Sequence, residues 1–169
     1  FFPLAVLDTL LGGARSMSLF AASEPSRSAR LYRALVDSGL ASEAGCYLLP
    51  TIDPYLFTCS ATVRTGCAPA EVEAALLAEL QRLASEPPPP EELRRAVHQT
   101  RAQFVYSAES VTDQGFWLGL AEVVADQAWL DGFLDSLARV SADDVARVAG
   151  EYLPEHKRTV GYYLPDSAG

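Results

Sequence analysis

The two histidines are the residues whose chemistry is simplest to recognise, because imidazoles at helical spacing commonly bind zinc. His156 ends the stretch YLPEH, which contains the Glu-His of the inverted zinc motif H-x-x-E-H. Tyr152 stands where that motif needs its first histidine, and Pro154 interrupts the helix that would place both ligands on one face. His98 lies in RRAVHQTR with no partner four residues away, so we expect it at the surface. The sequence therefore predicts no metal ligand.

Arginines and glycines offer a second kind of site, for an anion. Arg27, Arg30 and Arg33 recur every three residues, so they lie near one face of a helix and could hold a carboxylate or a peptide terminus. A solvated helix face explains the same spacing more simply. The pair Gly12-Gly13 has neither the G-x-G-x-x-G spacing nor the G-K-[ST] of a phosphate loop, and a helix C-cap explains it.

Nucleophiles and carboxylates show no catalytic arrangement either. Many serines are present, but no G-x-S-x-G elbow can be found. The acidic pairs Glu91-Glu92 and Asp143-Asp144 stand at expected helix starts, where the helix dipole explains them. We expect no catalytic residue in this chain, and the pattern leaves the substrate-binding residues unknown.

Composition excludes several classes of protein. The chain of 169 residues is 49% hydrophobic, enough for a single domain over 1–169. Its net charge of −9, with dispersed basic residues, disfavours binding to nucleic acid or to an anionic membrane, and no apolar run suits a membrane span. Cys46, Cys59 and Cys67 form no C-x-x-C pair, so we expect small buried hydrophobes in a reduced, cytoplasmic protein.

Periodicity predicts the elements that would position these residues. Helical spacing favours helices over 3–11, 28–38, 69–86, 90–125 with a break near 110–115, 132–140 and 141–153. Alternation favours an antiparallel hairpin over 40–64 with a turn at TIDP, and a last strand over 157–165, while 14–28 is expected as a loop. This order predicts the α+β class, a two-layer domain with helices packed on one face of a mainly antiparallel sheet.

The succession of motifs resembles a known family. The segments are, in order, LDTLLGG, SARLYRALVDSGLAS, the hairpin, APAEVEAALLAELQRL with PPEELRRAVHQTRAQF, VSADDVARVAGEYLP and RTVGYYLP. The order of these segments resembles that of the carboxyl-side domain of pitrilysin-like zinc peptidases. That family includes insulin-degrading enzyme and the mitochondrial processing peptidase. The resemblance implies two similar domains around a chamber, with zinc bound only by H-x-x-E-H and a distal glutamate of the first domain.

The resemblance also implies a pair of residues that grips the substrate backbone, an arginine followed seven residues later by a tyrosine. With Ser42 at the tyrosine position, Leu35 falls at the arginine position, or Val36 if one residue is deleted, so neither residue type is present. The first strand of such a domain would precede Phe1, so we expect a fragment of a longer chain. The sheet edge left open would allow a homo-oligomer.

From this resemblance we expect the non-catalytic domain of a bacterial zinc metallopeptidase. It would line the chamber opposite a zinc-bearing domain of the same chain or of a partner subunit, contact the peptide substrate and hold no cofactor itself. A domain of a catalytically silent homologue, acting as a partner subunit or scaffold, is the alternative. A small-ligand α+β module is a third possibility, because likeness of fold does not fix function.

Overall fold

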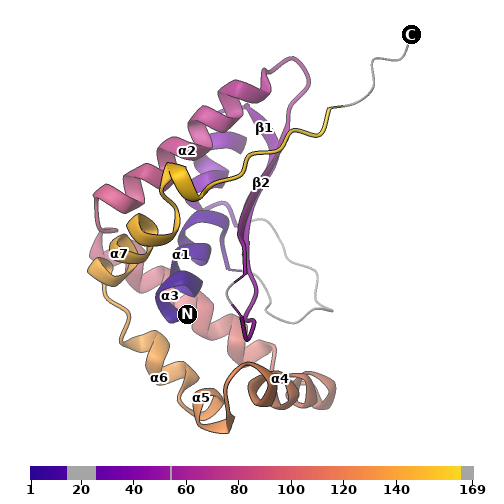
Figure 1. Ribbon diagram of the computed structural model, residues 1–169, viewed down its shortest axis with the longest axis vertical. Coiled ribbons are helices and arrows are strands. Elements are labelled where there is room, and N and C mark those ends of the chain that lie inside the picture. Colours follow the sequence, from indigo (N-terminus) through magenta and orange to yellow (C-terminus); the bar gives the residue numbers. More distant parts are fainter. Residues whose placement is uncertain (15–25, 54, 165–169) are drawn as a thin grey trace.

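The computed structural model describes residues 1–14, 26–53 and 55–164. Within these ranges the helices gather on one side of a β-hairpin (Figure 1). In chain order the elements are α1 (Phe2–Gly12), the π-helical turn η1 (Tyr32–Val36), β1 (Ala41–Leu48), β2 (Phe57–Val63), α2 (Pro69–Ser85), α3 (Pro90–Tyr106), α4 (Val111–Val124), α5 (Gln127–Asp131), α6 (Phe133–Ala138), α7 (Ala142–Tyr152) and the 3₁₀ turn η2 (Glu155–Lys157).

Helix α1 lies in the middle of the fold, between the hairpin and the outer helices (Figure 1). Pro3 stands in its first turn, where the missing N–H costs no hydrogen bond. Leu7 and Leu11, four residues apart, are fully buried. Gly13 ends the helix with a φ of +87°, and its N–H donates to the carbonyl of Thr9 over 2.9 Å. The predicted short helix with a glycine C-cap is confirmed.

Strands β1 and β2 form the antiparallel hairpin that the alternation predicts. The pairing places Leu48 opposite Phe57 at the loop end. A shift of register between Ala41 and Glu43 leaves Ser42 as an extra residue in β1, which is the geometry of a β-bulge. Residues 49–56 connect the strands, and residue 54 lies outside the described residues.

Gly12 allows β1 to approach α1 closely. A Cβ built on Gly12 would lie 2.5 Å from the backbone nitrogen of Cys46, so only a residue without a side chain fits there. The opposite face of the hairpin carries Thr58, Ser60 and Thr62, which are exposed. The hairpin thus has one face against the helices and one polar face.

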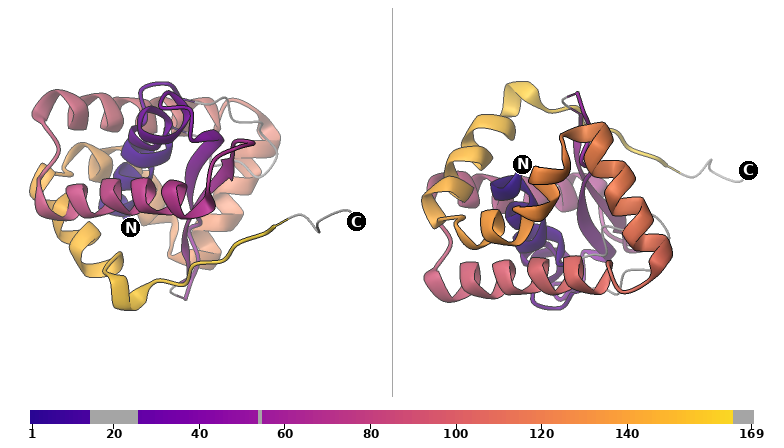
Figure 2. Two further views of the ribbon diagram at one scale, coloured as in Figure 1. Left: turned by 90° about the horizontal axis from the view of Figure 1, so that it is seen from above. Right: turned by 90° about the horizontal axis from the view of Figure 1, so that it is seen from below.

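The outer helices surround α1 (Figure 2). Helix α2 packs against α7, and α3 packs against α1. Leu83 of α2 and Val145 of α7 are fully buried in the same core. None of the described helices is both long enough and apolar enough to cross a membrane.

Aromatic rings close the end of the core near the amino terminus. Phe133 of α6 stacks on Phe104 of α3, with ring centroids 4.2 Å apart, and meets Trp117 of α4 and Trp129 of α5 edge-on. Ser107 accepts a hydrogen bond from the indole N–H of buried Trp117 over 2.8 Å. The aromatic cluster thus joins α4, α5 and α6 to α3.

The predicted α+β class, with helices on one face of an antiparallel sheet, is confirmed. Three details differ. The helix expected over 28–38 is centred on a π-helical turn, in which the N–H of Asp37 donates to the carbonyl of Tyr32. The break between α3 and α4 falls at 107–110, because the hydroxyl of Ser110 caps α4.

The third difference is the expected last strand, which is wrong for the described residues. Residues 158–164 have no regular secondary structure, and among the described strands only β1 and β2 pair. A strand requires a neighbour with which to exchange backbone hydrogen bonds, and alternation alone does not supply one. Most of the loop expected over 14–28 lies outside the described residues.

Candidate functional site

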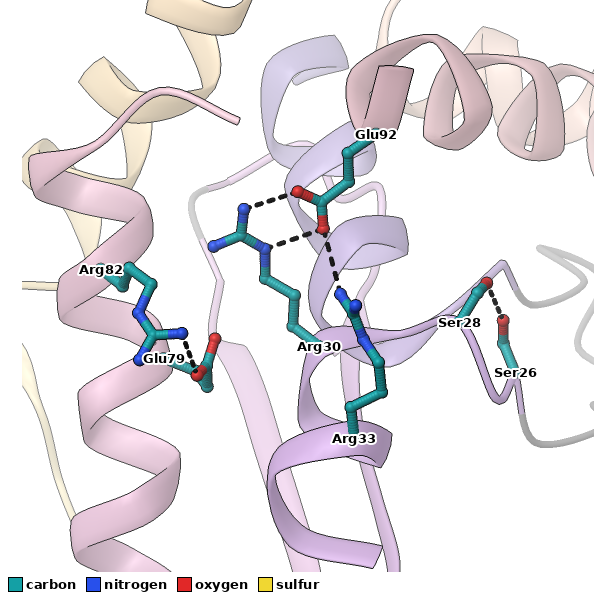
Figure 3. A network of polar contacts seen from close by, with 7 residues as sticks. All are labelled: Ser26, Ser28, Arg30, Arg33, Glu79, Arg82 and Glu92. Atoms are coloured by element: carbon teal, nitrogen blue, oxygen red, sulfur yellow. Dashed lines mark hydrogen bonds and ion pairs between the residues drawn. The ribbon is translucent and has the colours of Figure 1, made fainter. Parts of the chain in front are cut away.

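Arg30 forms the most buried ion pair among the described residues. Its Nε donates to Oε1 of Glu92 over 2.9 Å, and its Nη2 donates to Oε2 over 2.6 Å (Figure 3). The side chains are 10% and 12% exposed. This two-pronged geometry, which matches the guanidinium fork to a carboxylate, joins the helical turn before η1 to the first turn of α3.

Electrostatics at this junction favour the ionised carboxylate. Burial by itself would raise the pKa of Glu92. The hydrogen bond from Arg30, with the charges of Arg30, Arg33 and Arg95, outweighs burial and holds the pKa below its ordinary value. Glu92 stands in the first turn of α3, as expected, and Arg30, 62 positions away, reaches it as well.

The remaining arginines are more open. Arg33 places Nη2 3.5 Å from Oε1 of Glu92, and its side chain is 55% exposed (Figure 3). Arg27 is exposed and precedes the helical turn. The prediction of a solvated arginine face therefore holds for Arg27 and Arg33 but is wrong for Arg30. An incoming carboxylate would have to displace Glu92 from Arg30, so the geometry favours packing over ligand binding.

The two histidines lie on different elements of the fold. His98 on α3 and His156 on η2 are both exposed, which confirms the surface position predicted for His98. Pro154 follows the end of α7, as expected for the helix stop in YLPEH. Within 1–14, 26–53 and 55–164, no three His, Cys, Asp or Glu side chains are close enough to hold a metal ion. The described residues therefore do not fit a zinc ion.

The other acidic pairs have local structural roles. Glu91 forms an exposed ion pair with Arg94 over 2.8 Å on the same helix. Asp144 accepts hydrogen bonds from the backbone N–H and the hydroxyl of Ser141, and its own N–H donates back to that hydroxyl, which completes a capping box. The Ser141 hydrogen bonds lower the pKa of Asp144.

The positions at which the resemblance would place the substrate grip lie in η1 and at the start of β1. Leu35 is fully buried in the core, whereas Val36 is partly exposed. Ser42 sits at the bulge of β1, where its hydroxyl donates to the carbonyl of Thr62 over 3.3 Å. None of these three residues has a charged or phenolic side chain.

The structure brings together two cysteines that lie 13 positions apart in the sequence. Cys46 and Cys59 are directly opposite in the hairpin, with sulfur atoms 2.9 Å apart. Cys46 is buried, as expected, but Cys59 is only partly buried. The equal distance of both residues from the TIDP turn is a sequence signal that could have revealed the pair.

Comparison with protein families identifies a match over most of the chain. A family model described as the peptidase M16 inactive domain matches residues 1–100. No protein of curated function matches the chain in sequence.

Solved structures are similar over nearly the whole chain. The inactive peptidase domain of a proposed zinc protease from Bordetella parapertussis is 28% identical, with a TM-score of 0.83 over 99% of this chain and 85% of that chain. A proposed zinc protease from Bordetella pertussis Tohama I is also 28% identical, with a TM-score of 0.80 over 98% and 85%.

A protease from Helicobacter pylori shares the fold. Its TM-score is 0.80 at 23% identity, and the match covers 92% of this chain. This chain spans only 35% of the length of that protease.

Proposed function

This chain belongs to the family of peptidase M16 inactive domains, and we propose that it is the non-catalytic domain of a bacterial zinc-dependent metallopeptidase. In this proposal it forms the chamber wall opposite a zinc-bearing domain and contacts the peptide substrate. The observation that carries the proposal is the likeness, over almost the entire chain, to an inactive peptidase domain of a proposed zinc protease. That likeness and the family match support a division of labour between two domains.

Two features of the described residues support this division of labour. The groups that could bind a metal are scattered, so zinc and its general base would come from another domain. The hairpin is a two-stranded sheet within the described residues, and such a sheet leaves edge N–H and C=O groups able to pair with another polypeptide. A domain of this kind is suited to contact a partner or a peptide rather than to catalyse.

A catalytically silent scaffold or partner subunit is the second candidate. It is favoured by one specific observation, the buried Leu35 and the bulged Ser42 at the positions of the substrate grip. Without an arginine and a tyrosine there, this domain would lack the side chains that hold a substrate backbone. The two candidates share the fold and differ in whether the neighbouring domain carries H-x-x-E-H.

The test starts from the partner domain. The reading frame upstream of Phe1 and the neighbouring genes are searched for H-x-x-E-H followed by a distal glutamate. The zinc-bearing domain is then produced with and without this chain, and hydrolysis of a quenched fluorescent peptide library is measured with zinc and with a chelator. We expect zinc-dependent hydrolysis only when both are present, and none from this chain alone.

The matched control replaces the glutamate of H-x-x-E-H by glutamine, which should abolish hydrolysis without changing the complex. Equal hydrolysis by the zinc-bearing domain without this chain would contradict a role in the chamber. Zinc-dependent hydrolysis by this chain alone would contradict its non-catalytic role. A partner domain without the motif, in a stable and inactive complex, would establish the scaffold instead.

A further inference from the structure

Two thiols face each other across the hairpin. Cys46 of β1 and Cys59 of β2 are a directly opposed pair in the antiparallel register, two pairs in from the loop end. Their sulfur atoms are 2.9 Å apart. Both side chains lie on the face that packs toward the helices, since Cys46 belongs to the hydrophobic core and Cys59 packs against it.

This arrangement is close to the geometry of a disulfide. Directly opposed residues in antiparallel strands have Cα atoms about 4.5–5.5 Å apart, which lies within the range that disulfides span. A disulfide bond is about 2.05 Å long, so the sulfurs need to approach by less than roughly 1 Å. Small rotations of the two side chains achieve that without a change in strand register.

Access to the two sulfurs differs. Cys46 is buried, and its backbone nitrogen lies against Gly12 of α1, so its side chain is enclosed by the hairpin and the helix. Cys59 is partly exposed. A small oxidant in solution therefore reaches Cys59 first, and Cys46 is placed as the second thiol that resolves the intermediate.

We propose that Cys46 and Cys59 form a reversible cross-strand disulfide when the chain meets a low-molecular-weight disulfide. The thiolate of Cys59 attacks one sulfur of that reagent, which forms a mixed disulfide and releases one thiolate. The thiolate of Cys46 then attacks the sulfur of Cys59, which forms the Cys46–Cys59 bond and releases the second thiolate. The protein loses two electrons and two protons, and the reagent is reduced to two thiols.

The disulfide closes a loop that includes the exposed tip of the hairpin. Ile52, Tyr55 and Leu56 on this tip are large hydrophobic side chains left open to solvent. A two-stranded hairpin is marginally stable by itself, so a covalent link next to its loop restricts how far the tip can open. The inference rests on the hairpin geometry and is independent of the proposed function.

The experiment uses the full chain with Cys67→Ser, because Cys67 lies beyond β2 and would add a third thiol. The protein is equilibrated in buffers of oxidised and reduced glutathione, quenched with acid and labelled with a maleimide that counts the remaining thiols. Asp53 is the only acidic residue between the two cysteines, so a protease that cuts before aspartate separates them for mass spectrometry. The same titration is repeated in concentrated urea.

We expect both thiols to disappear together in monomeric protein, and the two peptides that flank Asp53 to stay linked until reduced. The folded chain should form the disulfide at a ratio of oxidised to reduced glutathione that is lower, by roughly thirtyfold or more, than the ratio that the chain needs in urea. Cys59→Ser in the same background keeps the buried Cys46 side chain and should form no internal link. Persistent labelling of both thiols in folded protein, links between molecules, or equal oxidation in urea would overturn the proposal.

Discussion

Removal of Arg30 tests whether the most buried ion pair holds the first helical segments against α3. In Arg30→Met, Glu92 loses hydrogen bonds of 2.9 and 2.6 Å, at a site where its side chain is only 12% exposed in the wild type. Breaking a fully buried pair costs about 3–5 kcal/mol, because the remaining charge is left without its partner. Arg33, 3.5 Å away, still offers partial compensation, and some solvent reaches the site. We therefore expect the free energy of unfolding to fall by about 2–3 kcal/mol.

The assay is urea unfolding followed by tryptophan fluorescence, since Trp117 and Trp129 report on the aromatic cluster. For a chain of this size the expected loss lowers the melting temperature by roughly 4–12 °C. Arg94→Met is the matched control, because Arg94 and Glu91 form an exposed pair of 2.8 Å on α3. We expect that control to change stability by less than about 0.5 kcal/mol.

Acid provides an independent check on the same pair. The folded pKa of Glu92 is depressed, so the stabilisation from its charge is present above the unfolded pKa, about 4.3, and is lost as the pH falls through the folded value. In Arg30→Met, only the charges of Arg33 and Arg95 still oppose the effect of burial, so the pKa of Glu92 is higher than in wild type and protonation of Glu92 relieves the variant.

The stability gap between wild type and Arg30→Met should therefore narrow below about pH 4. Arg30→Met combined with Glu92→Leu should recover most of the lost stability, because an apolar pair of similar volume can replace a buried ion pair. A cost no larger than that of Arg94→Met, or a gap that stays constant into acid, would refute the reasoning.

Two further substitutions test the close contacts of the core by the same unfolding assay. Gly12→Ala places a Cβ 2.5 Å from the backbone nitrogen of Cys46 and should lower the free energy of unfolding by about 2 kcal/mol. The control Gly150→Ala has open space around the new Cβ and should raise the free energy of unfolding by about 0.5–1 kcal/mol. Equal effects of the two substitutions would contradict the close approach of β1 to α1. Ser107→Ala removes the acceptor for the N–H of Trp117 and should cost about 1–3 kcal/mol, and a neutral result would mean that water replaces it.

Local signals in the sequence were sufficient for most of the secondary structure. The proline near the start of α1, the glycine after it and the hydroxyl cap of α7 each act within one helical turn, so their effect is visible in a short window. The hairpin is equally local, because alternation and the TIDP turn fix it together. These elements appear where the sequence predicts them.

Interactions between distant segments could not be predicted. Arg30 and Glu92 are 62 positions apart, and no local sequence pattern distinguishes either residue from its exposed neighbours. The prediction of a last strand is wrong for a related reason. Thr159, Val160 and Tyr162 suit a strand, but a strand needs a second strand with which to form backbone hydrogen bonds. Pairing is a property of two segments, and periodicity in one segment cannot supply the other.

The burial of Leu35 narrows how this domain could contact a substrate. Leu35 is fully buried in the hydrophobic core, so a charged side chain at that position would be removed from solvent and from a peptide at the surface. Val36 and Ser42 are open enough to touch a peptide, but one is apolar and the other already donates to Thr62. If the proposed function holds, contact with a substrate backbone at this junction would use main-chain groups, such as those at the bulge and the hairpin edges. Under the proposed function, such contacts would be independent of peptide side chains, as suits a chamber wall, and sequence preference would come from the proposed zinc-bearing domain.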